Sequence, residues 1–452
     1  MEQIASISLQ ILGSIFFLVF IAFGIASVFE HERRAVIVAF LLAVLGCSLF
    51  WGLSVLPDPL PRIAFWLTQT ALIVVVVLFY LSFGELEVVN EIPNRRFDER
   101  ETIFSRMRLK RGTTRFESYY TIHPDHAIED EKTRSKPGLL SLESKFANPF
   151  QFASTEGSFF LTESLFSAVD GPVFDKKATF NPQKMTQYIK GLAIFYGAKD
   201  VGITTLQPYH VYSHVGRGSG NYGDPLAVEH AFAIAFTVEM ENQMVASSPF
   251  PPTTMETGKQ YVEAARVAVQ LAGAIRAMGF PARAHIDGNY RVIAPLVARD
   301  AGLGEIGRMT LLMTPREGPR VRLGVVTTDL DLIPDVREPD QSMIDFCTIC
   351  EKCAAVCPSN SIPFGPRHEI DGAIRWKINP DTCFRYWNVV GTDCARCVSV
   401  CPFSHPDTFS HNLIRMGIKR SGFFRRLALW MDHLFYGKKP RPRRGPDWAN
   451  IA

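Results

Sequence analysis

Three long uncharged runs near the N-terminus place the strongest constraint on how this chain folds. Residues 3–29, 35–57 and 63–84 contain no charged side chain, and about 20 such residues are enough for a helix to cross a bilayer. A buried helix of a water-soluble protein would be shorter and amphipathic. We expect no cleaved signal peptide, because no basic segment precedes the first run and two further runs follow it. The sequence therefore predicts three membrane-spanning helices.

Basic residues beside these runs predict how the helices are oriented. Arg33 and Arg34 follow the first run, and seven Arg or Lys side chains fall within residues 95–111, whereas Arg62 is alone between the second and third runs. Positive charge marks the cytoplasmic side of a bilayer. We therefore expect a multi-pass protein of the cell inner membrane, with its large C-terminal part in the cytoplasm.

Eight of the nine cysteines lie between Cys347 and Cys401 and repeat one spacing. The first run, C-x2-C-x2-C-x3-C-P, has the spacing of bacterial ferredoxins with two 4Fe–4S clusters, in which the fourth cysteine binds the other cluster. The second run has the same ending after a first interval of ten residues. Structural zinc sites lack the x3-Cys-Pro ending, and a reducing compartment disfavours disulfides. The spacing predicts two 4Fe–4S clusters, one bound by Cys347, Cys350, Cys353 and Cys401 and the other by Cys357, Cys383, Cys394 and Cys397.

The segment before the cysteines has the pattern of a mixed α/β domain. Hydrophobic periodicity predicts a helix over residues 182–195, a short strand over 200–204 and a buried strand over 231–240. Residues 85–180 are polar with few periodic runs, so they predict only a juxtamembrane unit.

Two further elements carry the candidate catalytic residues. Thr257 and Gln260 match a capping box, which predicts that a helix starts there and ends at Gly279. A later alternating segment predicts a strand that has Arg320 and Arg322 on the same face.

Two glycine-rich stretches lie in the same region. Residues 302–307 match G-x-G-x-x-G, but a dinucleotide site needs a strand before the motif and a helix after it. Residues 294–301 have a helical pattern instead, so we expect a backbone that passes close to something large and flat. Residues 215–223 predict either a flexible loop or a ligand contact.

Several segments together resemble the corrinoid-dependent reductive dehalogenases. The similarity covers roughly residues 180–440 and includes the paired cysteine runs and the ending from Trp430 to Gly437. The other segments that carry it are residues 212–216, 260–272, 301–308, 312–315 and 318–322.

The resemblance implies a nitroreductase-like α+β core that holds base-off cobalamin without a covalent bond, beside the two clusters. It also implies that Tyr261 donates a proton, that Arg322 lies beside Tyr261, and that Asn289 supports the site; it does not assign the residues that contact the corrinoid. Physical reasoning agrees, because a helix N-terminus and a nearby arginine would lower the pKa of Tyr261. Strand alternation leaves Arg320 as a rival to Arg322.

These features predict an iron–sulfur and corrinoid oxidoreductase that replaces a halogen by hydrogen. Its partners would be an organohalide substrate, the lipid bilayer and a low-potential electron donor such as a ferredoxin, a flavodoxin or a membrane reductase. One alternative is a membrane-tethered ferredoxin-type electron-transfer protein. Another is a different corrinoid-dependent reductase, of the epoxyqueuosine reductase type. Respiratory dehalogenases usually carry a twin-arginine signal and a separate membrane subunit, so the three predicted spans argue against a respiratory role.

The charge of the chain limits which other partners it could bind. The net charge of +3 is too small to indicate nucleic-acid binding. The last 41 residues carry ten Lys or Arg against two Asp, so they either approach an anionic leaflet or pack over the core.

The predicted domains are residues 1–84 (three transmembrane helices), 85–180 (juxtamembrane unit), 181–335 (nitroreductase-like corrinoid-binding core), 336–411 (ferredoxin-like domain with two 4Fe–4S clusters) and 412–452 (basic C-terminal segment).

Overall fold

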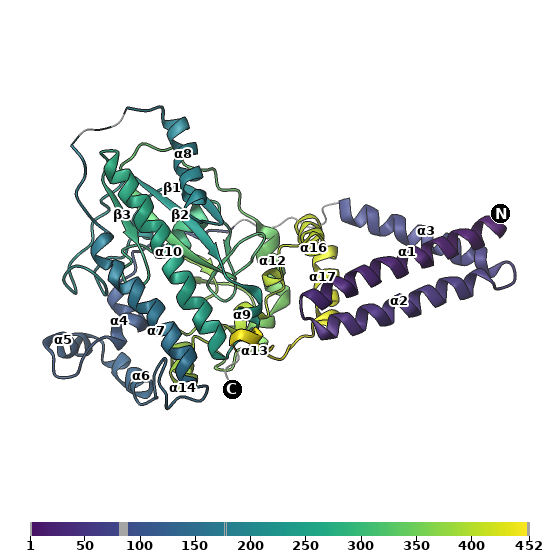
Figure 1. The fold of residues 1–452 in the computed structure, drawn as a ribbon, viewed down its shortest axis with the longest axis horizontal. Coiled ribbons are helices and arrows are strands. Elements are labelled where there is room, and N and C mark those ends of the chain that lie inside the picture. The colour runs from purple at the N-terminus through teal and green to yellow at the C-terminus, as the bar shows by residue number, and fades with distance from the viewer. Residues whose placement is uncertain (1, 81–88, 176, 178, 450–452) are drawn as a thin grey trace. The chain divides into compact units, whose positions relative to one another are not determined.

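A computed structural model of the chain contains two compact units (Figure 1). The structure describes residues 2–80, 89–175, 177 and 179–449. The helical unit, as we call it, contains Met1–Glu87 and Pro406–Pro440, and the large unit contains Val88–His405 and Arg441–Ala452.

Three long apolar helices make up most of the helical unit. α1 spans Glu2–Phe29, α2 spans Arg33–Ser54 and α3 spans Leu60–Tyr80. Each is long and apolar enough to cross a membrane. Many of their apolar side chains face outward, and so large an exposed apolar surface requires lipid or another protein to cover it. The three predicted apolar helices are confirmed, although residues 81–84 of the third run lie outside the described residues.

Two amphipathic helices from the C-terminal part complete the helical unit. α16 spans Phe409–Arg420 and α17 spans Gly422–Phe435. The ring of Phe435 packs against Phe20 and Phe23 of α1 and is buried with Ala35 and Ala39 of α2. Arg34 Nε donates to the carbonyl of Leu434 at 3.0 Å. The opposite face of the pair stays exposed and apolar, with Phe409, Leu413, Met416, Phe423 and Trp430.

A four-stranded antiparallel sheet is the centre of the large unit (Figure 1). Its strand order is β1-β2-β6-β3. In the register of β2 and β6, Gly324 lies opposite Phe236, and a Cβ at position 324 would lie 2.2 Å from the Phe236 ring. A larger residue would therefore displace this ring from the core. The strands are β1 Asp200–Thr205, β2 Phe232–Glu239, β3 Ala282–His285 and β6 Val321–Thr328.

Helices cover both faces of this sheet. α10 lies across one face, where Ile234 and Phe236 join its buried residues Leu271 and Ile275 in one apolar core (Figure 1). α11 covers the other face, where Ala233 and Ala235 pack with Val297. The side chains of successive residues in β2 thus point to opposite faces of the sheet, as expected for a pleated strand. The bounds of these helices are Pro182–Phe195 for α8, Pro251–Ala277 for α10 and Ala294–Asp300 for α11. The helix expected over residues 182–195 and the two expected strands are confirmed.

The predicted start of α10 is wrong. The helix begins at Pro251 with Phe250 at the N-cap, and prolines occupy its first two positions. Proline is favoured there because the first helical N–H groups lack partners and the ring fixes a helical φ. Thr257 therefore lies inside the helix, and its side chain makes a tertiary contact rather than a cap. Glycine at position 279 follows the end of the helix with φ +88°, as predicted.

The segment over residues 89–175 contains more helix than the sequence indicated. Its first three helices are short, and α5 and α6 are also polar, so they have little apolar periodicity to detect. α7 is longer and packs on α10, where Phe159 lies 6.4 Å from the ring of Tyr261. The helices are α4 Ile103–Met107, α5 Thr114–Ile122, α6 Pro124–Arg134 and α7 Pro149–Ser164.

Short helices and two hairpins make up the region around the cysteines, which lie in or next to the helices. They are β4 Glu305–Ile306 with β5 Leu312–Met313, α12 Gln341–Cys350, α13 Lys352–Val356, β7 His368–Ile370 with β8 Ala373–Arg375, α14 Pro380–Val390 and α15 Arg396–Ser399. A further helix, α9 Asn242–Ala246, precedes α10. Single-turn 3-10 helices occur at Glu99–Glu101, Leu165–Ala168, Pro208–His210, Pro402–Ser404 and Asp447–Ala449.

Candidate functional site

The structure brings Tyr261 and Arg322 together. Tyr261 projects from the middle of α10, and the guanidinium carbon of Arg322 in β6 lies 5.2 Å from the centre of its ring. Arg322 Nη2 donates to Thr257 Oγ1 at 2.9 Å and approaches Asp393 Oδ2 at 3.4 Å. Thr257 and Asp393 therefore fix the guanidinium over the ring, where the cation attracts the π-electrons.

Tyr261 is a weak acid in this environment. Burial raises the pKa of its phenol to about 12, Arg322 opposes that rise, and the carboxylates Asp287 and Asp393 add to it. The expectation of a lowered pKa is wrong for a structural reason: α10 starts at Pro251, so Tyr261 is far from the positive end of the helix dipole. Tyr261 and Arg322 nevertheless keep some accessible surface.

The rival arginine has a different place. Arg320 lies one residue before β6 and is 2% exposed. Its guanidinium pairs with Glu239 at 2.9 Å and donates to the carbonyl of Ser404 at 3.1 Å. Arg320 therefore ties the sheet to the end of the cysteine segment, whereas Arg322 faces Tyr261.

Asn289 is buried beside the glycine-rich loop. Its Oδ1 accepts hydrogen bonds from Ser219 N at 3.2 Å, Ser219 Oγ at 3.1 Å and Arg283 Nη2 at 3.0 Å. Its Nδ2 is buried without a hydrogen-bond partner among the described residues. Gly218 has φ +76°, and a Cβ there would lie 2.4 Å from Asn289 Oδ1. The loop thus needs glycine at position 218 to close on Asn289, which leaves one amide donor free for another group.

Two residues that the sequence did not single out complete this cluster. Arg217, in the same loop, pairs with Glu99 at 3.0 Å, and Glu99 also accepts from the backbone N–H groups of residues 216 and 217. Asp287 has its pKa raised by burial, and the charges of Arg217 and Arg322 oppose this. In the sequence, the only indication that Arg217 belongs to the site was its position as a charged residue among glycines. The loop is therefore held by a buried ion pair, rather than being a flexible linker.

The other glycine motif has a local explanation. α11 precedes it and β4 lies within it, so the context of a dinucleotide site is absent from this described segment. A Cβ at Gly304 would lie 2.1 Å from the carbonyl of Met313, and one at Gly307 would lie 2.7 Å from the Met313 side chain and 3.6 Å from Cys347 Sγ. The close approach predicted from the glycines is thus to the chain's own β4–β5 hairpin, beside one of the cysteines.

The eight cysteines form two electrostatically coupled groups. Burial raises the pKa of Cys401, and Cys347, Cys350 and Cys353 raise it further. Burial likewise raises the pKa of Cys383 to about 11 and of Cys394 to about 12, and Cys357 adds to both. The pKa of Cys397 is also raised by burial and by Cys383 and Cys394. Cys401, the last cysteine of the second run, is thus coupled to cysteines of the first run, and Cys357, the last of the first run, is coupled to cysteines of the second. The two ligand sets remain a prediction.

Buried thiolates this close repel one another unless cationic iron compensates them. Among the described residues, no group of three or more His, Cys, Asp or Glu side chains is placed to bind a single metal ion. A cluster does not need such convergence, because each thiolate binds a different iron.

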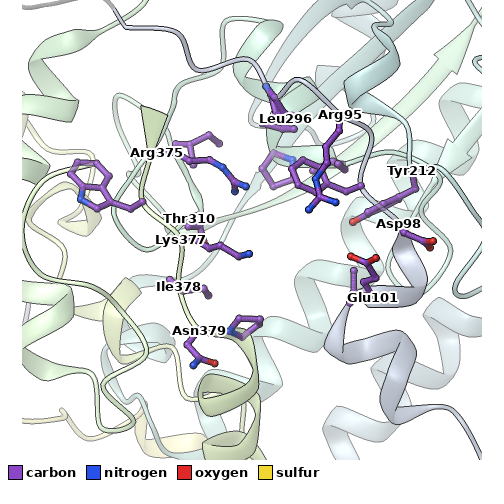
Figure 2. Close-up of a pocket in the computed structure, with 18 of the residues that line it drawn as sticks. Arg95, Asp98, Glu101, Tyr212, Leu296, Thr310, Arg375, Lys377, Ile378 and Asn379 are labelled. Carbon is purple, nitrogen blue, oxygen red and sulfur yellow. The ribbon is translucent and has the colours of Figure 1, made fainter. Parts of the chain in front are cut away.

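A cavity of about 710 Å³ lies in the large unit (Figure 2). Arg375, Lys377 and Asn379, between β8 and α14, lie on one side of it, and Tyr212 and Glu101 lie on the other (Figure 2). Asn379 is the N-cap of α14, the helix that carries Cys383. Apolar residues supply much of the remaining wall, including Ile293, Pro295, Leu296, Ile306, Ile374 and Trp376. The cavity therefore has room for a large, partly apolar ligand next to the cysteine segment.

Comparisons with known proteins agree with this arrangement. Residues 346–405 match the family model of the 4Fe-4S dicluster domain. The chain is 31% identical to tetrachloroethene reductive dehalogenase of Sulfurospirillum multivorans over 296 residues, which are 58% of each chain. It is 30% identical to epoxyqueuosine reductase of Listeria monocytogenes over 25% of this chain and 30% of that one. The structure of the catabolic reductive dehalogenase NpRdhA in complex with 3-bromo-4-hydroxybenzoic acid matches with a TM-score of 0.63 and 24% identity, covering 79% of this chain and 49% of that chain.

These matches confirm the predicted resemblance and its relation to epoxyqueuosine reductase. The likeness to NpRdhA shows a shared fold. The chain aligns with 58% of the first of these relatives, and its three apolar helices precede the region of resemblance described above.

Proposed function

We propose that this homologue of the reductive dehalogenases is a membrane-anchored oxidoreductase that replaces the halogen of an organohalide by hydrogen, R–X + 2e⁻ + H⁺ → R–H + X⁻. The observation that carries the proposal is the Tyr261–Arg322 pair, a phenol beneath a guanidinium at a partly accessible position. The same unit holds eight grouped thiols. The reaction needs a proton and two electrons; Tyr261 would provide the proton, and clusters bound by the thiols would carry the electrons.

Tyr261 would hold the proton on its hydroxyl until carbon accepts it. A phenol with a pKa of about 12 stays protonated at neutral pH, which is the form a donor needs. The phenolate left behind would lie beside Arg322, whose charge Thr257 and Asp393 hold in position. Asn289 would use its free Nδ2 to orient a bound group.

The residues present suit base-off cobalamin bound without a covalent link. The cavity beside the cysteine segment offers apolar walls for a flat macrocycle, and Thr310 and Lys377 as donors for its polar periphery. The unpartnered Asn289 Nδ2 and Arg322 Nε are further buried donors that a bound group would satisfy. When bound, cobalamin supplies the reduced cobalt at which a carbon–halogen bond is cleaved.

Two 4Fe–4S clusters would deliver the electrons. We assign Cys347, Cys350, Cys353 and Cys401 to one cluster and Cys357, Cys383, Cys394 and Cys397 to the other. The coupling of the thiols within each set supports this assignment. Cys353 of one set also interacts with Cys397 of the other, so the two clusters would lie close together. The external donor would be a low-potential ferredoxin, flavodoxin or membrane reductase.

The helical unit would anchor the enzyme in the inner membrane. α1, α2 and α3 would span it. The excess of basic residues after the first and third spans supports a cytoplasmic location for the large unit. The exposed apolar face of α16 and α17 suits the membrane interface, since basic residues such as Lys419 and Arg426 flank it.

Purification in detergent without air tests the proposal. We expect about eight irons and one cobalt per chain and halide release from a panel of haloalkenes and haloaromatics with a low-potential donor. Iron without cobalt would leave only the electron carrier. Cobalt without halide release would favour a reductase of the epoxyqueuosine reductase type.

A further inference from the structure

A second cavity, of about 570 Å³, borders the glycine-rich loop that closes on Asn289, and it is basic. Its lining includes Arg108, Lys110, Arg115 and Arg217, and no carboxylate. The inner part is formed by the glycine-rich loop, and the mouth by the segment between α4 and α5. A low-dielectric cavity lined by one sign of charge concentrates ions of the opposite sign.

The positive charge of this cavity is only partly neutralised within the protein. Arg217 is paired with the buried Glu99 at 3.0 Å. Arg108 approaches Glu163 at 3.9 Å, and both side chains are at least half exposed, so water screens that pair. Arg115 stacks over the Tyr222 ring at 5.6 Å.

Tyr222 gives an independent indication that a ligand belongs here. Its hydroxyl is buried and has no hydrogen-bond partner among the described residues. An unmade hydrogen bond at a buried hydroxyl costs free energy that a native structure ordinarily avoids. An acceptor bound beside Arg115 would satisfy the hydroxyl and the guanidinium together.

The basic cavity is connected to the catalytic cluster. Arg108 Nη2 lies 3.5 Å from the position that a Cβ on Gly288 would take, and that glycine separates Asp287 from Asn289. The loop that lines the cavity also closes on Asn289: a Cβ on Gly218 would lie 2.4 Å from Asn289 Oδ1, and Ser219 N donates to the same oxygen at 3.2 Å. The cavity therefore borders the Asn289 side of the proposed site.

We propose that the basic cavity binds the anionic group of the substrate, so that the organohalides used by this chain are halogenated acids, with a carboxylate held near Arg115 and Lys110. This inference rests on the proposed function, whose substrate it specifies. The carboxylate would accept charge-assisted hydrogen bonds from Arg115, Lys110 and the Tyr222 hydroxyl, while the carbon–halogen bond would point to the side of the cavity that borders Asn289.

Binding to the purified holoprotein without an electron donor tests this separately from turnover. The probes are 3-chlorobenzoate and its neutral isostere 3-chlorobenzamide, with dissociation constants measured by equilibrium dialysis. We expect the benzoate to bind at least tenfold more tightly than the amide. Arg115→Gln and Lys110→Gln should each weaken benzoate binding about tenfold, the loss expected for one charge-assisted hydrogen bond, and leave amide binding unchanged.

Arg111→Gln is the matched control. Arg111 is in the same segment, is paired with Glu131 and does not line the cavity; its loss should leave both dissociation constants unchanged. Equal binding of acid and amide, or equal losses in the control, overturns the proposal. Loss of cobalt from Arg115→Gln or Lys110→Gln also overturns it, because the cavity would then serve a phosphate of the cofactor. Benzoate binding with no halide release would contradict the proposed function and leave the anion site standing.

Discussion

Replacing Arg322 with methionine tests whether the guanidinium stabilises the phenolate form of Tyr261. The charge lies 5.2 Å from the ring centre, and at an effective dielectric constant of about 20 this separation corresponds to about 3 kcal/mol of attraction for the phenolate. If the phenolate is half formed in the transition state, the barrier rises by about half of that, and each 1.4 kcal/mol or so is a factor of ten. We expect kcat to fall about tenfold, and up to a hundredfold if proton transfer is nearly complete.

The assay is halide release under anaerobic conditions with a low-potential donor, and cobalt and iron contents are measured on the same sample. Tyr261→Phe removes the hydroxyl and keeps the ring, so it should cost about a hundredfold to ten-thousandfold while the cofactors load normally. Arg322→Lys keeps a charge in the same position and should recover part of the loss.

The double variant distinguishes this mechanism from a merely structural role. If Arg322 acts through the phenolate, Arg322→Met should add little once Tyr261→Phe has removed the phenol, so the two effects on kcat should be strongly non-additive. Independent, additive effects would refute the reasoning. Near-normal turnover of Tyr261→Phe would show that another residue donates the proton.

The remaining predictions concern pH, the clusters, the loop and the membrane. Because the Tyr261 pKa is raised to about 12, its proton is available below that pKa and lost above it, so rate profiles between pH 6 and about 9 should show no basic limb from this group. Cys350→Ala should remove about four of eight irons and leave membrane insertion intact; retention of all iron would contradict the ligand assignment. Gly218→Ala should displace Asn289 and lower the midpoint of thermal unfolding more than Gly220→Ala, because both glycines have positive φ but the nearest atom to a Cβ is 2.4 Å away at the first and 3.7 Å away at the second. A C-terminal fluorescent protein that matures only in the cytoplasm should be bright, whereas activity of a periplasmic phosphatase fusion would reverse the topology.

The parts of this structure that could be predicted from the sequence are those set by local chemistry. Uncharged runs longer than a bilayer is thick allow few alternatives to spanning helices, and the structure has such helices at all three. The cysteine spacing predicted a dicluster segment, which the family model matches. Helix α8 and strands β1 and β2 followed from periodicity because each buries a regular apolar face.

The parts that could not be predicted depend on tertiary contacts. Thr257 looked like a cap because Thr and Gln at that spacing often are one, but its hydroxyl instead donates to Asp393 at 2.5 Å, a partner more than a hundred residues away. The raised pKa of Tyr261 depends on burial by elements such as α7, which has too little periodicity to detect. Arg320 and Arg322 share a strand pattern, and only the chain packed around them distinguishes Arg320, which pairs with Glu239, from Arg322, which lies over the Tyr261 ring.

Asp393 links the two halves of the proposed chemistry. It precedes Cys394, and its carboxylate accepts hydrogen bonds from Thr254 at 3.0 Å and Thr257 at 2.5 Å on α10, while lying 3.4 Å from Arg322. The helix that carries the proposed proton donor, Tyr261, is therefore tied by one buried carboxylate to the loop that carries Cys394. Because a proton and electrons must meet at one carbon, a misplacement of about 1 Å between their sources would slow the reaction severely. A shared anchor fixes that separation, which gives a physical reason for an acidic side chain in a place where burial alone would disfavour it.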